Sequence, residues 1–173
     1  MALPTDPATW PATLEAMRNI GLRLRADGVF EHQGVAVTHA RLQHALLSWL
    51  ARTEDGRDIV TLDPGDDGDA ASTRRFAYVT VEDTHLRARS ARWTEQDRCL
   101  ITWDDLRETE LAYESIVVSA DHSWRVAVGP LTGRVRGAAY QQMLSHIESD
   151  DDATFWLRAA GQRWALPMAS AAG

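Results

Sequence analysis

The chain has 173 residues, a net charge of −7 and 45% hydrophobic residues, a composition typical of a globular protein of one or two domains. An acidic chain is a poor partner for nucleic acid, because neutralising phosphates requires a basic surface. No apolar run approaches the ~20 residues of a membrane helix, and the N-terminus lacks the basic and apolar regions of a secretory signal. We therefore expect a cytoplasmic protein that binds neither nucleic acid nor membranes.

The kinds of side chain present exclude several chemistries. Cys99 is the only cysteine, so an internal disulfide or a multi-cysteine metal site cannot form. The 18 basic residues other than histidine are all arginine, which excludes Schiff-base chemistry and a phosphate-loop lysine. The sequence contains neither a G-x-S-x-G motif nor a G-x-G-x-x-G motif. We expect no cofactor.

The chain begins with an arm and a β-plus-helix unit. Residues 1–21 contain three prolines and predict an extended arm that ends in a short helix over 11–19. Residues 22–62 predict the unit, in which a helix follows Thr38 as its N-cap and runs to about Arg52. Alternating apolar residues predict strands at 22–24, 29–32, 35–37 and 58–62. Residues 63–73, DPGDDGDAAST, predict a solvated acidic loop.

The stretch from Arg74 to Trp93, RRFAYVTVEDTHLRARSARW, is expected to form the centre of the fold. Aromatic and β-branched residues recur with period-two spacing over 76–81, and apolar or small residues alternate with arginines from Leu86 onward, which is typical of strands. The intervening residues 82–84, Glu-Asp-Thr, favour a turn because Asp and Thr side chains bond to the local backbone. We therefore predict a β-hairpin with one apolar and one arginine-rich face, in the middle of a main sheet over 74–167.

Further strands and a second helix complete this predicted sheet. The patterns predict strands at 99–103, 116–119 and 124–128, a loop from Gly129 to Gly133, a helix over 137–147 and a final hairpin over 154–166. Residues 168–173 predict a disordered tail. The predicted fold class is α+β, with mostly antiparallel sheet and two packed helices. Both halves run strand, loop, short strand and helix, which predicts two related β-plus-helix units unless two short apolar helices resemble each other by chance.

Two adjacent carboxylates and a nearby histidine are the candidates for catalysis. Glu82 and Asp83 with His85 could act as an acid–base group or hold a metal. Neighbouring strand residues point to opposite faces, however, so these carboxylates converge only if the turn bends them together. The competing interpretation is a turn that caps itself and pairs with arginines. The six histidines lack the spacing of a metal site, so we expect no bound metal.

The arginines around the predicted hairpin are the candidates for ligand binding. They concentrate positive charge in an otherwise acidic chain, and the four we single out are Arg74, Arg75, Arg87 and Arg89. Guanidinium groups at alternating strand positions can grip a carboxylate or a phosphate through two hydrogen bonds. The competing interpretation is a solvated sheet face that is neutralised by Glu82, Asp83 and the acidic loop.

Tryptophans supply the candidates for a protein interface. The chain has seven, most of them on predicted strands or at strand ends. Aromatic residues are enriched in the centres of interfaces, and we single out Trp93 and Trp124 as interaction residues. The competing interpretation is that the tryptophans fill a thin core.

The order of these features resembles the DUF1285 family of bacterial proteins of unknown function. The resemblance is carried by DGVFEHQGVAVTHARLQHALLSWLAR (27–52), EDGR (54–57), VED (81–83), WRVAVGPLTG (124–133), the helix over 137–147 and WALP (164–167). The chain departs from the family at VEDTH, where the family usually has a proline, and in its longer acidic loop. The resemblance implies a mixed fold of two related β-plus-helix units. It implies no established activity and no catalytic residues.

These observations lead to three functional hypotheses. The first is a non-catalytic binding or regulatory module that engages a small anionic ligand or a protein partner. The second is a structural subunit of a larger bacterial assembly, which the proline-rich arm and the tryptophans favour. The third is an enzyme that uses Glu82, Asp83 and His85. The sequence leaves the oligomeric state open.

Overall fold

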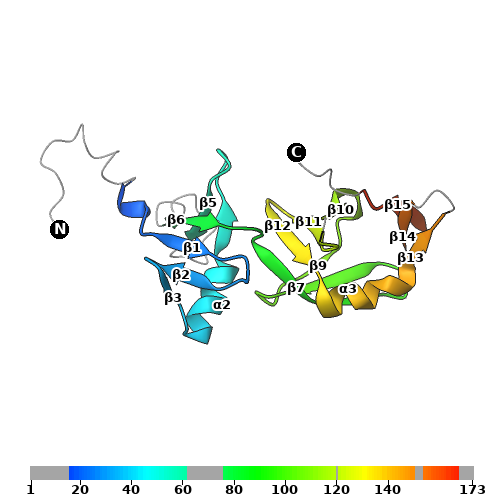
Figure 1. Ribbon diagram of the computed structural model, residues 1–173, viewed down its shortest axis with the longest axis horizontal. Helices are drawn as coiled ribbons and strands as arrows, with labels where there is room; N and C mark the ends of the chain where they lie inside the picture. Colours follow the sequence, from blue (N-terminus) through cyan, green and yellow to red (C-terminus); the bar gives the residue numbers. More distant parts are fainter. Residues whose placement is uncertain (1–15, 62–75, 120, 151–153, 168–173) are drawn as a thin grey trace, which may run out of the picture. The chain divides into compact units, whose positions relative to one another are not determined.

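The computed structural model describes residues 16–61, 76–119, 121–150 and 154–167. The chain forms two compact units, Met1–Asp83 and Thr84–Gly173 (Figure 1). Among the described residues, no helix is long and apolar enough to span a membrane. The predicted acidic loop, tail and most of the arm lie outside the described residues. Of the short helix predicted over 11–19, residues 16–18 are helical.

The first unit is a mixed sheet built from two antiparallel meanders. In its described part the strands are β1 (Leu22–Leu24), β2 (Phe30–His32), β3 (Val35–Ala36), β4 (Leu50–Arg52), β5 (Asp58–Thr61) and β6 (Phe76–Val81). The sheet order is β3-β2-β1-β6-β5-β4, and β1 lies parallel to β6. Helix α2 (Ala40–Ser48) joins the two meanders. Leu24, Phe30 and Val60 are fully buried and form the centre of the core.

The second unit repeats this plan. In its described part the strands of the large sheet are β7 (Leu86–Trp93), β8 (Cys99–Trp103), β9 (Glu108–Glu110), β10 (Val117–Val118), β11 (Trp124–Val128) and β12 (Leu131–Val135). The order is β10-β11-β12-β7-β8-β9, with β12 parallel to β7. Helix α3 (Gly137–Met143) follows and lies along β7 (Figure 1). A short 3₁₀ helix then leads to a small antiparallel sheet of β13 (Ile147–Ser149), β14 (Phe155–Ala159) and β15 (Gln162–Ala165).

Both large sheets therefore have the strand order third, second, first, sixth, fifth, fourth. Their first strands begin alike, as Leu22-Arg23-Leu24-Arg25 in one unit and Leu86-Arg87-Ala88-Arg89 in the other. This confirms the α+β class and the presence of two related β-sheet units. The equivalence predicted for the two helices is wrong within this plan. Helix α2 follows the third strand of its sheet, whereas α3 follows the sixth.

The hairpin predicted around residues 82–84 is also wrong. Strand β6 pairs with β1 and β5, whereas β7 pairs with β8 and β12. The two strands thus belong to different sheets, and residues 82–85 connect the two units. The prediction failed because alternation of polarity reports that a strand is half-buried but does not identify its partner.

Three element boundaries differ from the sequence prediction. Helix α2 has His39 as its N-cap and ends at Ser48, after which Leu50–Arg52 forms β4 and pairs with β5. Gly133 lies inside β12 rather than in a loop. The second helix ends at Met143, and Ile147 begins β13. After each of the two helices, apolar residues that also fitted a helical pattern pair as a strand instead.

Five hairpin turns in the described parts of the chain share one hydrogen-bond pattern. The first residue of each donates its N–H to the carbonyl four residues on, and its own carbonyl accepts from the N–H three residues on. The residue three positions after the first has a positive φ, which favours glycine. The five residues at this position are Gly28, Gly56, Asp97, Leu106 and His122.

Candidate functional site

The second unit contains a cavity of about 330 Å³. It lies between the end of the large sheet, α3 and the small sheet. Seven described residues line it: Val118, His122, Trp124, Tyr140, Ile147, Phe155 and Leu166. A concave, mostly apolar pocket of this kind is the usual form of a small-molecule site.

Strand pairing places the floor of the cavity. Val118 of β10 lies directly opposite Trp124 of β11, and Trp124 lies opposite Val135 of β12, so the three side chains share one face. Helix α3 places Tyr140 against Trp124, with the rings edge to face and their centroids 5.4 Å apart. The pair holds two aromatic walls in fixed orientations.

The small sheet supplies the opposite wall. The N–H of Leu166 donates to the carbonyl of Phe155 (2.9 Å), and the N–H of Val118 donates to the carbonyl of Pro167 (2.9 Å). The chain after β15 therefore ties the small sheet to β10 at the cavity. Phe155 is 49% exposed, so the cavity is open to solvent on this side.

His122 lies in the turn between β10 and β11, which is one of the five hairpin turns described above. It occupies the positive-φ position of that turn, with φ of 60°. Its side chain is exposed and makes no hydrogen bond or ion pair with any residue that the structure describes. Its neighbours Asp121 and Ser123 are engaged with each other and with Arg134. The Oγ of Ser123 donates to Asp121 (2.7 Å), Arg134 Nε donates to Ser123 Oγ (3.0 Å), and Arg134 forms an ion pair with Asp121. The hydrogen bonds from Ser123, together with Arg134, lower the pKa of Asp121 to about 2.

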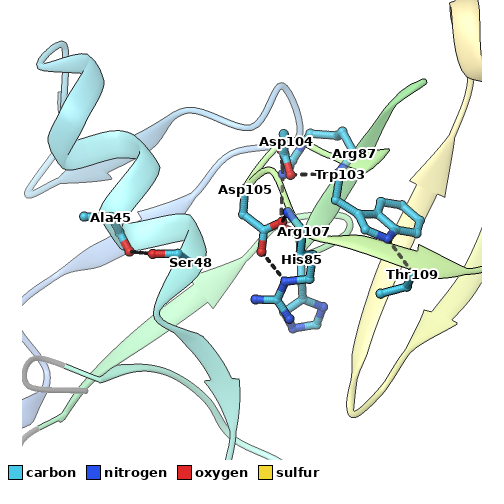
Figure 2. Close-up of polar contacts among 9 residues, drawn as sticks. All are labelled: Ala45, Ser48, His85, Arg87, Trp103, Asp104, Asp105, Arg107 and Thr109. Carbon is cyan, nitrogen blue, oxygen red and sulfur yellow. Dashed lines mark hydrogen bonds and ion pairs between the residues drawn. The ribbon is translucent and has the colours of Figure 1, made fainter. Parts of the chain in front are cut away.

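A second polar cluster surrounds Arg87 (Figure 2). The side chain of Arg87 is 12% exposed, and its guanidinium donates to the carbonyl of His85 (3.3 Å) and lies 3.7 Å from Asp104 Oδ2. The backbone of Arg87 is also tied to Asp104, because its N–H donates to Asp104 Oδ1 (3.2 Å) and its carbonyl accepts from the N–H of Asp104 (2.9 Å). Burial raises the pKa of Asp104, an effect that Arg87 opposes. Arg87 is therefore held within the fold.

Comparisons with known proteins show which solved structures have a similar fold. No protein-family model matches the sequence, and no curated protein matches it closely. A DUF1285 family protein from Silicibacter pomeroyi DSS-3 has a similar structure, with a TM-score of 0.65 at 15% identity over 86% of this chain and 80% of that chain. The chain has the DUF1285 fold. A DUF1285 family protein from Shewanella baltica OS155 agrees, with a TM-score of 0.56 at 14% identity over 74% of this chain and 93% of the other. The resemblance predicted from the sequence is thus confirmed by the fold.

The DUF1285 fold separates the four arginines predicted to bind a ligand. Arg74 and Arg75 lie outside the described residues. Arg87 contacts Asp104 and the carbonyl of His85. Arg89 lies where the register between β7 and β8 shifts, is exposed, and makes no hydrogen bond or ion pair with the residues that the structure describes. The β-bulge at this shift leaves one residue without a partner on the neighbouring strand.

Of the three residues predicted for catalysis, Glu82 and His85 hold the backbone through hydrogen bonds and Asp83 is half-buried. Glu82 accepts from the N–H of Ala26 (2.8 Å) and pairs with Arg23 (2.7 Å) in the first unit. Asp83 is half-buried. His85 is buried in the second unit, where its Nδ1 accepts from the N–H of Thr132 (3.0 Å). His85 therefore bridges the parallel strands β7 and β12 at their start.

Cys99 and the metal-ligating residues complete the list of candidates for chemistry. Burial raises the pKa of the Cys99 thiol to about 12, which keeps the thiol protonated. Among the described residues, no three His, Cys, Asp or Glu side chains group together as metal ligands do.

The two tryptophans predicted to interact with a partner differ in their surroundings. Trp124 is fully buried and forms a wall of the cavity. Trp93 stacks on His146, with centroids 3.5 Å apart, and its Nε1 donates to the carbonyl of Gln142 (3.1 Å). Trp93 thus fastens the end of α3 to β7.

Sequence reasoning singled out one of the seven cavity residues, Trp124, as a site residue. Tyr140 fell on the predicted apolar face of the second helix, and His122 in a predicted turn. His122 is the lining residue with an imidazole, but the sequence alone gave no reason to single it out, because the same turn position also takes Asp97 and Leu106. The remaining lining residues come from β10, β13, β14 and the chain after β15, and no local pattern brings these segments together.

Proposed function

We propose that this protein is a non-catalytic binding module and that its second unit takes a small, largely apolar ligand into the cavity beside Trp124. The single observation that carries the proposal is the cavity itself. It is walled by aromatic and aliphatic side chains from the large sheet, α3 and the small sheet. Trp124 and Tyr140 contact each other edge to face, and Phe155 stands at the open side.

The volume limits the size of the ligand. A cavity of roughly 150 Å³ lined by apolar side chains holds one benzene molecule, and this cavity has about 330 Å³. The space therefore suits a ligand with two or three aromatic rings, or an aliphatic chain of similar bulk. Burial of such a ligand would be driven by removal of its apolar surface from water.

The proposal is tested with phenylnaphthylamine, an uncharged two-part aromatic probe whose fluorescence rises in apolar surroundings. Ile147 lines the cavity and is half-buried, so Ile147→Trp would fill the space. Leu144, three residues earlier, is 40% exposed and does not line the cavity, so Leu144→Trp is the matched control. We expect saturable binding to the wild-type protein and to Leu144→Trp, and loss of binding in Ile147→Trp. Absence of binding to the wild-type protein, or equal binding to both variants, would overturn the proposal.

A second candidate function is the binding of a small anion at Arg89. The supporting observation is that this guanidinium is exposed and without a partner among the described residues, whereas Arg87 is engaged by Asp104. An exposed arginine can bind a phosphate or a carboxylate through paired hydrogen bonds. Titration with inorganic phosphate, followed by NMR, should shift the side-chain signal of Arg89, and Arg89→Gln should abolish the other shifts around it. Shifts that persist in that variant would place the anion elsewhere.

A further inference from the structure

We infer that His122 selects the ligand of the cavity, and that the preferred ligand carries an anionic group on its apolar body. The inference rests on the proposed function and names the ligand class. Of the seven described lining residues, His122 is the one whose side chain can carry a positive charge; the other six are aliphatic or aromatic, and Tyr140 among them has a hydroxyl. An imidazole can donate a hydrogen bond to a carboxylate or a sulfonate, and it does so with a positive charge when protonated.

The imidazole is available for such a contact. The side chain of His122 is exposed, lines the cavity and makes no hydrogen bond or ion pair with the residues that the structure describes. The turn itself is held through the backbone, because the N–H of His122 donates to the carbonyl of Ser119 (2.8 Å). The side chain is therefore not needed to close the turn.

Among the described residues, the carboxylates near the cavity are engaged elsewhere, so they oppose an anion less than their number suggests. Asp121 precedes His122 but accepts from Ser123 and pairs with Arg134. Glu148 follows Ile147, so it lies on the other face of β13, where it pairs with Arg158 and Arg163. Asp150 accepts from Trp156 Nε1 (3.0 Å) and from the N–H of Thr154 (3.0 Å).

The backbone at residue 122 is left-handed, as it is at the same position of all five turns. His122 has φ of 60°, in the position that Gly28 and Gly56 occupy in the equivalent turns of the first unit. A side chain in this left-handed conformation costs free energy that glycine does not. Asp97 and Leu106 adopt the same conformation and do not line the cavity, so the backbone alone does not mark a binding site. What distinguishes His122 is that its side chain lines the cavity.

The test compares two probes that share one aromatic skeleton. Anilinonaphthalene sulfonate carries an anionic group, and phenylnaphthylamine does not. We expect the wild-type protein to bind the sulfonate about tenfold more tightly, as a hydrogen bond to a charged group implies. His122→Gly keeps the backbone of the turn and removes the imidazole. We expect this variant to lose the preference and to bind the two probes with equal affinity.

Leu106→Gly is the matched control. Leu106 occupies the same turn position, with φ of 69°, and does not line the cavity. This variant relieves the same backbone strain and should keep the preference for the sulfonate. A preference that survives in His122→Gly, or no preference in the wild-type protein, would overturn the inference and leave the proposed function standing. Failure of phenylnaphthylamine to bind, or binding that Ile147→Trp does not block, would overturn both.

Discussion

The indole of Trp103 lies against the backbone of Gly133, so close that a Cβ at residue 133 would come within 2.4 Å of the ring atoms Cζ3 and Cη2. Trp103 is 1% exposed, and its Nε1 donates to Thr109 Oγ1 (2.8 Å), so the ring is held in place (Figure 2). Strand β7 lies between the two strands that carry these residues. Gly133 is therefore required for close packing across the centre of the sheet, and not for a turn.

Gly133→Ala should destabilise the second unit. The added methyl group would overlap the Trp103 ring and also lie 2.9 Å from Val128 Cγ2. Overpacking of a buried site typically costs about 1–3 kcal/mol of unfolding free energy, which denaturant titration measures. The same substitution in a Trp103→Leu background should cost less, because the ring is gone. An equal cost in both backgrounds would show that Trp103 is not the cause.

Arg87 and Arg89 should respond differently to the same change. Arg87→Gln removes a guanidinium that contacts Asp104 and the carbonyl of His85, and should lower the unfolding free energy by about 1–3 kcal/mol. Arg89→Gln changes an exposed residue without a described partner, and should alter stability by less than about 0.5 kcal/mol. Denaturant titration of both variants checks this. Equal losses would mean that Arg89 is as firmly engaged as Arg87.

Leu106→Gly should stabilise the protein. Leu106 is 57% exposed and adopts φ of 69° in the turn between β8 and β9. A left-handed conformation costs a side-chain-bearing residue about 1–2 kcal/mol, part of which is offset by the greater entropy of glycine in the unfolded chain. We expect a net gain of roughly 0.5–1 kcal/mol, measured as a higher midpoint of thermal unfolding. A lower midpoint would show that the leucine side chain contributes to folding.

Asp121 should titrate far below the ordinary aspartate range. Hydrogen bonds from Ser123 and the charge of Arg134 lower the pKa of its carboxyl from 3.8 to about 2. A lowered pKa stabilises the folded state above the unfolded value, so this contribution is present above about pH 4 and is lost as the pH falls toward 2.

Carboxyl NMR titration measures this pKa directly. The Ser123 hydroxyl bond is the largest single cause and Arg134 also lowers the pKa, so Ser123→Ala and Arg134→Gln should each raise the pKa of Asp121. Wild-type titration near 3.8 would mean that the cluster of Asp121, Ser123 and Arg134 does not form in solution. No rise in either variant would mean that these contacts do not lower the pKa of Asp121.

The candidate site was only partly accessible from the sequence. Trp124 and the turn at Asp121-His122 were recognisable, because aromatic content and turn residues are local features. The cavity was not, since Val118, Tyr140 and Phe155 meet only when three separate segments pack together. The arginine pair illustrates the opposite error. Arg87 and Arg89 look equivalent in the sequence, but Asp104 engages only the first, from a turn 17 residues away.

The sequence by itself determined that the fold is α+β and where many of its strands and tight turns fall. The alternation of polarity over 22–24, 99–103 and 124–128 and the residues of the turns were enough for that, because burial of one face and positive φ are local requirements. Only the tertiary structure decided which strands are neighbours. In each large sheet, a parallel pair, β1–β6 or β7–β12, joins the first strand to the sixth, about fifty residues apart in the sequence. Because β6 and β7 pair in this way, they do not form the predicted hairpin with each other. Such distant pairing depends on the packing of whole faces, which no short stretch of sequence records.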